Sequence, residues 1–275
     1  THFDLAVSYI EGGSAYYVHD HVSAAKKAAF IHVDYVQAGY TRRLDKDCYV
    51  DFDRIFAVSN ETAGVFAGVY PECQQKLSVF HNLIDTEAIR QKALSPAEKS
   101  MHEGIRLLTV GRLTPQKGFD CAVYALKLLL EKQYPVYWYI IGEGPEYGRL
   151  TQLARSLHVE DHFIFLGMQT NPYPYFKMAD FYIHATRFEG KSIAIQEAQV
   201  LGCAIAASDC SGNREQIVSG VDGLLCPFSP EGIANAVEYL IEHPQTAESF
   251  GREAAQKACH FENDIHMIRD LLYSP

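Results

Sequence analysis

Short apolar runs that end in glycine alternate with helical stretches from residue 105 onward, and this alternation restricts the fold more than any other feature of the chain. The runs at 105–110, 136–141 and 163–166 are each followed directly by a glycine. Helical stretches separate them, one over 119–132 and the next ending at Leu157. Strands that are almost continuously apolar and alternate with helices are typical of parallel sheets. The sequence therefore predicts a doubly wound α/β domain.

The same pattern extends toward the C-terminus. The further predicted elements are a strand over 180–185, a helix over 192–201, a strand over 204–207, and two or three helices after Glu231. We place this Rossmann-like domain at 105–258. The remainder, 259–275, is predicted to form a C-terminal helix that packs back on the first domain.

The first part of the chain has four runs that fit the strands of a similar domain, at 3–9, 28–33, 54–59 and 76–80. The segment after them is polar, contains Pro96 and lacks a strand pattern, so we predict an interdomain linker over 85–104. The preceding piece, 1–84, is shorter than the roughly 100–150 residues of a usual domain. It also opens almost at once on a strand. We therefore expect the C-terminal portion of a Rossmann-like domain whose first strands are missing.

Charge and cysteine content exclude several classes of protein. The net charge is −10, which makes this chain a poor candidate for nucleic-acid binding, because a basic stripe is the usual surface for it. No apolar run reaches the roughly 18 residues of a membrane-spanning helix. The seven cysteines lack the close pairs of a zinc site, and their number is odd. Reduced thiols of a cytosolic protein are the expected state.

The first motif is a glycine turn between a strand and a helix, over 111–118. Gly111 follows the strand, and the next helix begins after Gly118. Free N–H groups and the helix dipole make such a turn suited to anions. Arg112 offers a bidentate fork and Lys117 a point charge, both appropriate for phosphate. The alternative is an ordinary solvated loop.

A second glycine turn, at 142–144, resembles a dinucleotide-binding fingerprint but does not meet its requirements. The third glycine, Gly148, comes one residue late, and Pro145 lies inside the turn. No acidic residue closes the strand at 163–166, where a ribose partner is expected. We therefore predict a tight turn with Pro145 in the first helical turn, and the spacing argues against a nicotinamide-dependent oxidoreductase.

The third motif, over 189–198, contains two glutamates eight positions apart. Glu189 precedes a predicted helix and Glu197 lies about two turns inside it, so the helix start falls between them. Backbone N–H groups from Lys191 to Ile193 can receive a phosphate there, and both carboxylates can accept hydrogen bonds from sugar hydroxyls. The alternative is a solvated acidic helix start.

One of the twelve histidines also has a functional interpretation. His32 ends a predicted strand, and the carboxyl ends of strands face the ligand crevice of an open α/β sheet. The alternative is a hydrogen-bonded core histidine. The other histidines, including His81 and His184, have no special claim.

The motifs occur together in a fixed order, and as a set they resemble glycosyltransferase family 4, the retaining enzymes of GT-B fold. The matching positions are Gly111-Arg112-Leu113 with Lys117-Gly118, Gly142-Glu143-Gly144-Pro145, Ala179-Asp180, Glu189-Gly190, Glu197-Ala198, Gly202, Ser208-Asp209, Gly212, Glu215 and Gly220-Val221-Asp222-Gly223. The glutamate pair resembles the E-x7-E signature of the family. Lys191-Ser192 stands where many members have an aromatic or small residue, which leaves the donor sugar open.

This resemblance implies two Rossmann-like domains that face across a cleft, the first one incomplete here. It implies that His32 and Glu189 act at the reacting sugar. The donor-binding residues implied by position are Gly111, Arg112, Lys117, Gly190, Lys191, Ser192, Ile193 and Glu197. No metal or other cofactor is implied, because the nucleotide sugar is itself a substrate.

The activity implied is transfer of a hexose-type sugar, with retention, from a nucleoside-diphosphate sugar to a glycan or lipid-linked acceptor in cell-surface polysaccharide synthesis. UDP is the expected nucleotide and GDP the alternative. We expect a cytoplasmic protein, with peripheral contact at the inner face of the plasma membrane left open, as is its oligomeric state. Because the first domain is short, we expect this form to bind nucleotide but to transfer sugar slowly or not at all. The alternatives are a non-catalytic nucleotide-sugar-binding module, an epimerase of the same fold and, less favoured, the oxidoreductase.

Overall fold

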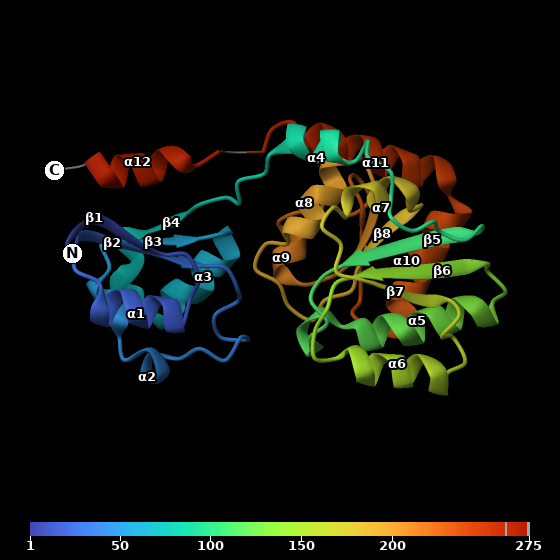
Figure 1. The fold of residues 1–275 in the computed structure, drawn as a ribbon, viewed down its shortest axis with the longest axis horizontal. Coiled ribbons are helices and arrows are strands. Elements are labelled where there is room, and N and C mark those ends of the chain that lie inside the picture. Colours follow the sequence, from blue (N-terminus) through green and yellow to red (C-terminus); the bar gives the residue numbers. More distant parts are fainter. Residues whose placement is uncertain (262, 274–275) are drawn as a thin grey trace. The chain divides into compact units, whose positions relative to one another are not determined.

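The computed structural model describes residues 1–261 and 263–273, which divide into two compact units (Figure 1). Unit 1 contains Thr1–Leu83, Phe188–Lys191 and the described part of 262–275. Unit 2 contains Ile84–Arg187 and Ser192–Phe261. The chain therefore passes more than once from one unit to the other, and the segment 188–191 belongs to unit 1 although its sequence neighbours belong to unit 2.

Unit 2 is built on a six-stranded sheet in which every paired strand is parallel. The strands are β5 (Ile105–Val110), β6 (Val136–Ile141), β7 (Phe163–Gly167), β8 (Phe181–His184), β9 (Ala204–Ser208) and β10 (Leu224–Cys226). Their order across the sheet is β10-β9-β8-β5-β6-β7. This parallel order confirms the predicted doubly wound α/β fold.

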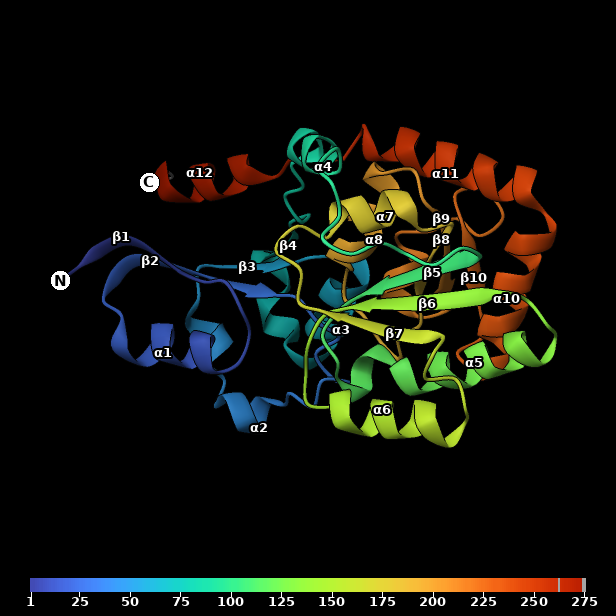
Figure 2. The ribbon, with the colours of Figure 1, turned by 45° about the vertical axis from the view of Figure 1, so that its right-hand side comes forward.

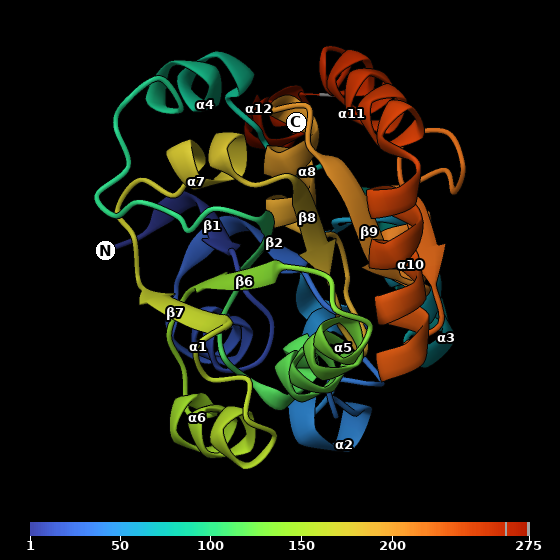
Figure 3. The ribbon, with the colours of Figure 1, turned by 90° about the vertical axis from the view of Figure 1, so that its right-hand side faces the viewer.

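Helices cover both faces of this sheet (Figure 2). One face carries α5 (Phe119–Glu131), α6 (Tyr147–Ser156) and α10 (Pro230–Glu242), and α10 lies beside α5 (Figure 3). The other face carries α7 (Tyr173–Met178) and α8 (Ile193–Val200). The core is dense because the strands are apolar on both sides. Trp138, the only tryptophan, is fully buried there and donates its indole N–H to Thr109 Oγ1 at 2.9 Å.

The segment predicted as a linker contains a helix, α4 (Thr86–Lys92). Asp85 caps it by accepting the N–H of Ala88 at 2.9 Å, which satisfies one of the otherwise unpaired donors of the first turn. Ile89 is buried against Val200, on α8, and against Ala258 at the end of α11 (Pro244–Ala258). Within 85–104 the buried residues are Ile89 and Ala93, too few to give a periodic apolar pattern that would indicate the helix.

Unit 1 has a four-stranded parallel sheet with the strands in sequence order. The strands are β1 (Phe3–Ser8), β2 (Ala24–Ile31), β3 (Arg54–Ala57) and β4 (Leu77–Val79). One face packs under α1 (Gly13–His21) and α3 (Asn60–Val69), with the rings of Tyr35, Tyr49 and Phe66 buried between them. This unit is also Rossmann-like in its parallel strands and covering helices.

The other face of the unit 1 sheet is covered by α12 (Ile265–Tyr273) (Figure 1). Leu271 packs with Phe30, Phe56 and Phe80, and its carbonyl accepts a hydrogen bond from Lys26 Nζ at 3.0 Å. None of the helices within residues 1–261 and 263–273 combines the length and the apolar composition of a membrane-spanning segment.

Candidate functional site

The sheet of unit 2 reverses its direction of growth at β5. This strand pairs with β6 on one side and with β8 on the other. The loops after β5 and β8 therefore leave the sheet side by side at their carboxyl ends. Open α/β sheets bind ligands at this topological switch point. In unit 2 these loops comprise 111–118, 185–187 and Ser192, and they contain Gly111, Arg112, Lys117 and Ser192, which were predicted to bind the donor.

The loop after β5 presents its two cations together. The side chain of Lys117 runs across Gly111, with Lys117 Cδ 3.8 Å from the position that a Cβ on Gly111 would take. A 3₁₀ turn over Pro115–Lys117 leads into Gly118, whose φ of 62° turns the chain into α5. Arg112 is exposed, and its guanidinium forms no ion pair within residues 1–261 and 263–273. The loop thus keeps a cation available for an anionic ligand.

Segment 185–187 fixes this loop in place. Gln116 O accepts hydrogen bonds from Arg187 N at 2.9 Å and from Thr186 Oγ1 at 3.1 Å. The Arg187 guanidinium pairs with Asp120 at 2.8 Å. Burial on its own would raise the pKa of Asp120, but the hydrogen bonds from Arg187 hold the pKa of that carboxyl below its ordinary value. Arg187 and Asp120 support the site and were not predicted, because residues so far apart in sequence give no local signal.

The glycines at 142 and 144 bring a second loop against the first. A Cβ on Gly142 would lie 2.0 Å from the carbonyl oxygen of Gly111, and one on Gly144 would lie 2.3 Å from that of Leu113. Pro145 lies outside the helix, which begins at Tyr147, so its predicted place in the first helical turn is wrong. Beside this loop is a pocket of about 530 Å³, lined by Gly142, Glu143, Gly144, Tyr147, Phe165, Leu166 and Gly167.

The start of α8 is capped and leaves N–H groups open. Ser192 is the N-cap residue, and its hydroxyl accepts the N–H of Ile195 at 3.4 Å. The N–H groups of Ile193 and Ala194 have no partner within the helix, as expected for its first residues. A helix therefore begins directly after Ser192, which serves as its cap.

Glu197 lies on the inner part of α8 and is held by a tyrosine that the sequence did not reveal. Tyr173, at the start of α7, donates its hydroxyl to Glu197 Oε1 at 2.9 Å. Burial raises the pKa of Glu197, and the hydrogen bond from Tyr173 opposes that shift only in part. The buried environment of Glu197 therefore disfavours the charged form of its carboxyl group. Tyr173 orients Oε1, and Oε2 can accept a further hydrogen bond.

Replacement of Glu197 by glutamine is expected to stabilise unit 2 at neutral pH. When the folded pKa of a carboxyl is raised, the free energy of unfolding decreases as the pH rises from the ordinary pKa of 4.5 toward the folded pKa. Glutamine lacks that charge and can still accept from Tyr173. Urea unfolding followed by Trp138 fluorescence should show a stability difference that grows with pH and then levels off. If the difference in stability between Glu197→Gln and the wild type did not change with pH, the raised pKa of Glu197 would be contradicted.

The remaining predicted residues lie in unit 1. Gly190 lies against the strand end at His32, since a Cβ on Gly190 would be 2.0 Å from the carbonyl oxygen of His32. Lys191 O accepts a hydrogen bond from Asn82 Nδ2 at 3.4 Å. Glu189 is buried, with 8% of its surface exposed. His32 follows β2 directly, as predicted. Unit 1 thus brings His32 and Gly190 together, and unit 2 brings Lys117 against Gly111, the neighbour of Arg112.

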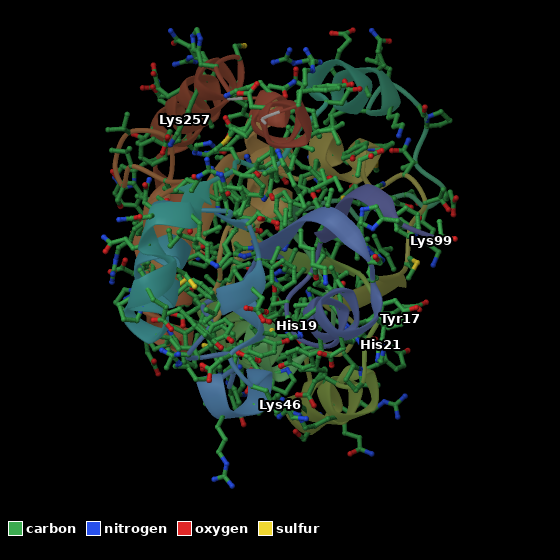
Figure 4. All side chains as sticks on the ribbon, turned by 90° about the vertical axis from the view of Figure 1, so that its left-hand side faces the viewer. Tyr17, His19, His21, Lys46, Lys99 and Lys257 are labelled. Carbon is green, nitrogen blue, oxygen red and sulfur yellow. The ribbon has the colours of Figure 1, made fainter. Side chains whose placement is uncertain are left out.

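Other histidines take part in local pairs. His19, on α1 (Figure 4), bridges Asp20 at 2.6 Å and Asp51 at 2.8 Å. His81 pairs with Asp264 at 2.8 Å, which ties the end of β4 to the segment before α12. Within the described residues, no group of three or more His, Cys, Asp or Glu side chains is arranged to hold a metal ion.

The chain matches known proteins over most of its length. A family model described as glycosyl transferases group 1 matches residues 90–257. The Campylobacter jejuni N-acetylgalactosamine-N,N'-diacetylbacillosaminyl-diphospho-undecaprenol 4-alpha-N-acetylgalactosaminyltransferase is 30% identical over 200 residues, 72% of this chain and 53% of that protein. An uncharacterized glycosyltransferase of Methanocaldococcus jannaschii is 25% identical over 180 residues, 64% of this chain and 42% of that protein. The chain spans about half the length of these curated relatives.

Solved structures of GT-B glycosyltransferases share the fold. A glycosyltransferase from Rickettsia africae has a TM-score of 0.80 at 18% identity, covering 99% of this chain and 78% of that one. The Anabaena protein HepE in complex with UDP has a TM-score of 0.75 at 19% identity, covering 91% of this chain and 72% of that one. The fold thus agrees with the family model, which covers more than half of the chain. The chain belongs to the glycosyl transferases group 1 family.

Proposed function

We propose that this chain binds a nucleoside-diphosphate sugar and serves in a retaining glycosyltransferase that moves a hexose-type sugar to a glycan or lipid-linked acceptor. The observation that carries the proposal is the pair of cations on the loop after β5. Arg112 and Lys117 stand at the switch point of the sheet, where a diphosphate would also meet the open N–H groups of α8. Negative charge builds on the diphosphate as the sugar–oxygen bond breaks, and fixed cations and dipoles stabilise it.

The nucleoside is assigned to two features of unit 2. Glu197 would accept hydrogen bonds from the ribose hydroxyls with the carboxylate oxygen that Tyr173 leaves open. The pocket beside Gly142 is lined by glycine backbone and by the rings of Tyr147 and Phe165, surfaces against which a flat base can pack. UDP is the proposed nucleotide, and the solved Anabaena structures with UDP and with UDP-glucose support this choice.

Residues of unit 1 are assigned to the sugar. His32 and Glu189 would act at the transferred hexose, with Gly190 and Lys191 supplying backbone groups. We propose that no metal is needed, because Arg112 and Lys117 provide the positive charge that a cation would otherwise supply. The name of the Campylobacter relative contains a diphospho-undecaprenol, and a lipid-linked acceptor of that kind would place this chain at the cytoplasmic face of a membrane.

A titration with three nucleotides tests the proposal. Isothermal titration of the 275-residue chain should show binding of UDP, weaker binding of GDP, and none of nicotinamide adenine dinucleotide. Addition of a chelator should leave the UDP affinity unchanged. Binding of the dinucleotide without UDP would favour the oxidoreductase, and no binding of any nucleotide would refute the assignment. Release of UDP from a UDP-sugar then separates an enzyme from a non-catalytic module.

Tyr173→Phe separates the hydrogen bond that Glu197 accepts from Tyr173 from the one that it is proposed to accept from the ribose. This variant removes the hydroxyl that orients Oε1 and retains the ring. We expect the UDP affinity to fall about threefold to tenfold, the range for the loss of one hydrogen bond of ordinary strength. Tyr124→Phe, which changes an exposed tyrosine of α5, serves as the control. Equal affinities of Tyr173→Phe and the wild type would exclude a role for Tyr173 in orienting the ribose ligand.

A further inference from the structure

Glu11 places a buried carboxylate beside the histidine that ends β2. Strands β1 and β2 are neighbours in the sheet, with Ser8 opposite Ala29, so the segments that follow them meet. The Glu11 side chain is only 6% exposed, and its Oε2 accepts the backbone N–H of His32 at 3.0 Å. A hydrogen bond from a backbone amide to a buried carboxylate is charge-assisted and stronger than a neutral one. The backbone of His32 is therefore anchored by Glu11.

The imidazole of His32 is oriented by the same carboxylate and by two rings. Its Nδ1 lies 3.8 Å from Glu11 Oε2, is buried, and has no hydrogen-bond partner within residues 1–261 and 263–273. The ring stacks on that of Phe30, with 5.8 Å between the ring centroids, and makes an edge contact with Tyr9, with 5.0 Å between the centroids. A quarter of the His32 side chain is exposed, and because Nδ1 is buried this exposure lies on other atoms. Nδ1 therefore lies on the side of Glu11, at 3.8 Å from its Oε2.

The charge of Glu11 persists despite its burial. Burial on its own would raise the pKa of Glu11, but the imidazole and the backbone N–H of His32 hold it below its ordinary value. The other titratable groups near this carboxylate are the hydroxyls of Tyr40 and Tyr49, and Tyr49 accepts the N–H of Gly12 at 3.3 Å. Neither carries a positive charge, so the groups that stabilise the Glu11 carboxylate are the backbone N–H and the imidazole of His32.

We propose that Glu11 is a positioning residue for His32: it attracts the imidazole proton to Nδ1 and leaves Nε2 unprotonated as the acceptor for a hydroxyl of the donor sugar. In neutral imidazole the hydrogen bond made by one nitrogen decides the protonation of the other. The separation of 3.8 Å is longer than a hydrogen bond, and contacts of this kind often shorten when substrate binds. The role at the sugar rests on the proposed function, whereas the preference for one tautomer does not.

Nitrogen NMR of the full chain labelled in histidine tests the tautomer directly. His32→Gln identifies the signal, and the pH is set so that the imidazole is neutral. We expect the Nδ1–H form to predominate in the wild type. Glu11→Gln keeps the size and an oxygen acceptor but removes the charge, so this predominance should be lost. Glu72→Gln changes an exposed carboxylate of the same unit and should leave the spectrum of His32 unchanged. A wild type in the Nε2–H form, or a Glu11→Gln spectrum identical to wild type, overturns the proposal.

Ligand affinity then tests the role at the sugar. The probe is UDP-glucose or UDP-N-acetylglucosamine, whichever the wild type binds more tightly, with UDP as the reference. Glu11→Gln should bind this UDP-sugar about threefold to tenfold more weakly, the range expected for one impaired hydrogen bond. Its affinity for UDP should be unchanged. Equal affinity of the variant and the wild type for the UDP-sugar overturns the role of Glu11. If the wild type binds no UDP, the proposed function fails, while the tautomer result stands independently.

Discussion

Unit 2 is expected to lose about 3 kcal/mol or more of stability when Gly142 is replaced by alanine, since both backbone strain and overpacking oppose the new methyl group. Gly142 has a φ of 140°, a conformation that residues with a Cβ rarely adopt. The methyl group would also lie 2.0 Å from the carbonyl oxygen of Gly111, and a backbone atom cannot turn aside as a flexible side chain can. The loop that carries Arg112 would have to shift, so UDP binding should fall as well.

Gly148 provides the matched control for this substitution. It lies in α6, its φ is not positive, and nothing is within 4 Å of the position that a Cβ would take. Gly148→Ala should therefore stabilise the protein by about 0.5–1 kcal/mol, as for glycine replaced in a helix. Urea unfolding followed by Trp138 fluorescence reports on unit 2 for both variants. Equal stability of Gly142→Ala and the wild type would contradict the close approach of the two loops.

Removal of both cations from the loop after β5 should abolish most nucleotide binding. Each charge-assisted contact to phosphate contributes about 1.5–3 kcal/mol, so Arg112→Ala/Lys117→Ala should weaken UDP binding by about 3 kcal/mol or more, beyond 100-fold. Arg112→Ala alone should change stability little, because Arg112 is exposed and forms no ion pair with the described residues. The wild-type affinity should fall with added salt, and that of the double variant should be less sensitive.

Isothermal titration at two salt concentrations measures this effect. Arg155→Ala removes an exposed cation from the end of α6, also in unit 2, and should keep the wild-type affinity. Uridine, which lacks the diphosphate, should bind the double variant and the wild type alike. If the double variant lost affinity for uridine as strongly as for UDP, the cations would be supporting the loop rather than binding phosphate.

The parallel sheet of unit 2 was predictable because its strands are apolar on both faces. The ranges of β5 and β6 coincide with the predicted runs at 105–110 and 136–141, since glycine at the end of each run marks where the chain turns. The three-residue strand β10 was not predicted, because so short a run gives no periodic signal. Helix α7 was missed as well, because a six-residue helix that begins beside Pro172 resembles a loop in sequence.

The site was predictable only where chemistry follows from local sequence. A glycine turn with two cations can be recognised within 111–118, so Arg112 and Lys117 were candidates from the start. The residues that orient the site come from distant segments: Tyr173 reaches Glu197 from the start of another helix. Glu11 reaches His32 from the end of a neighbouring strand. Such partners depend on which strands are adjacent, and that order is a property of the folded sheet rather than of any single motif.

Because α12 packs on unit 1 but is synthesised after unit 2, the order of synthesis affects when each unit can complete its core. Leu271 covers the sheet of unit 1, yet the lysine that bonds to its carbonyl is 245 residues earlier in the chain. Domains generally fold as units during translation, the N-terminal one first. Here α12 cannot cover Phe30, Phe56 and Phe80 until it has left the ribosome, and by then every residue of unit 2 has been synthesised. The unit that begins the chain is therefore the last one able to complete its core.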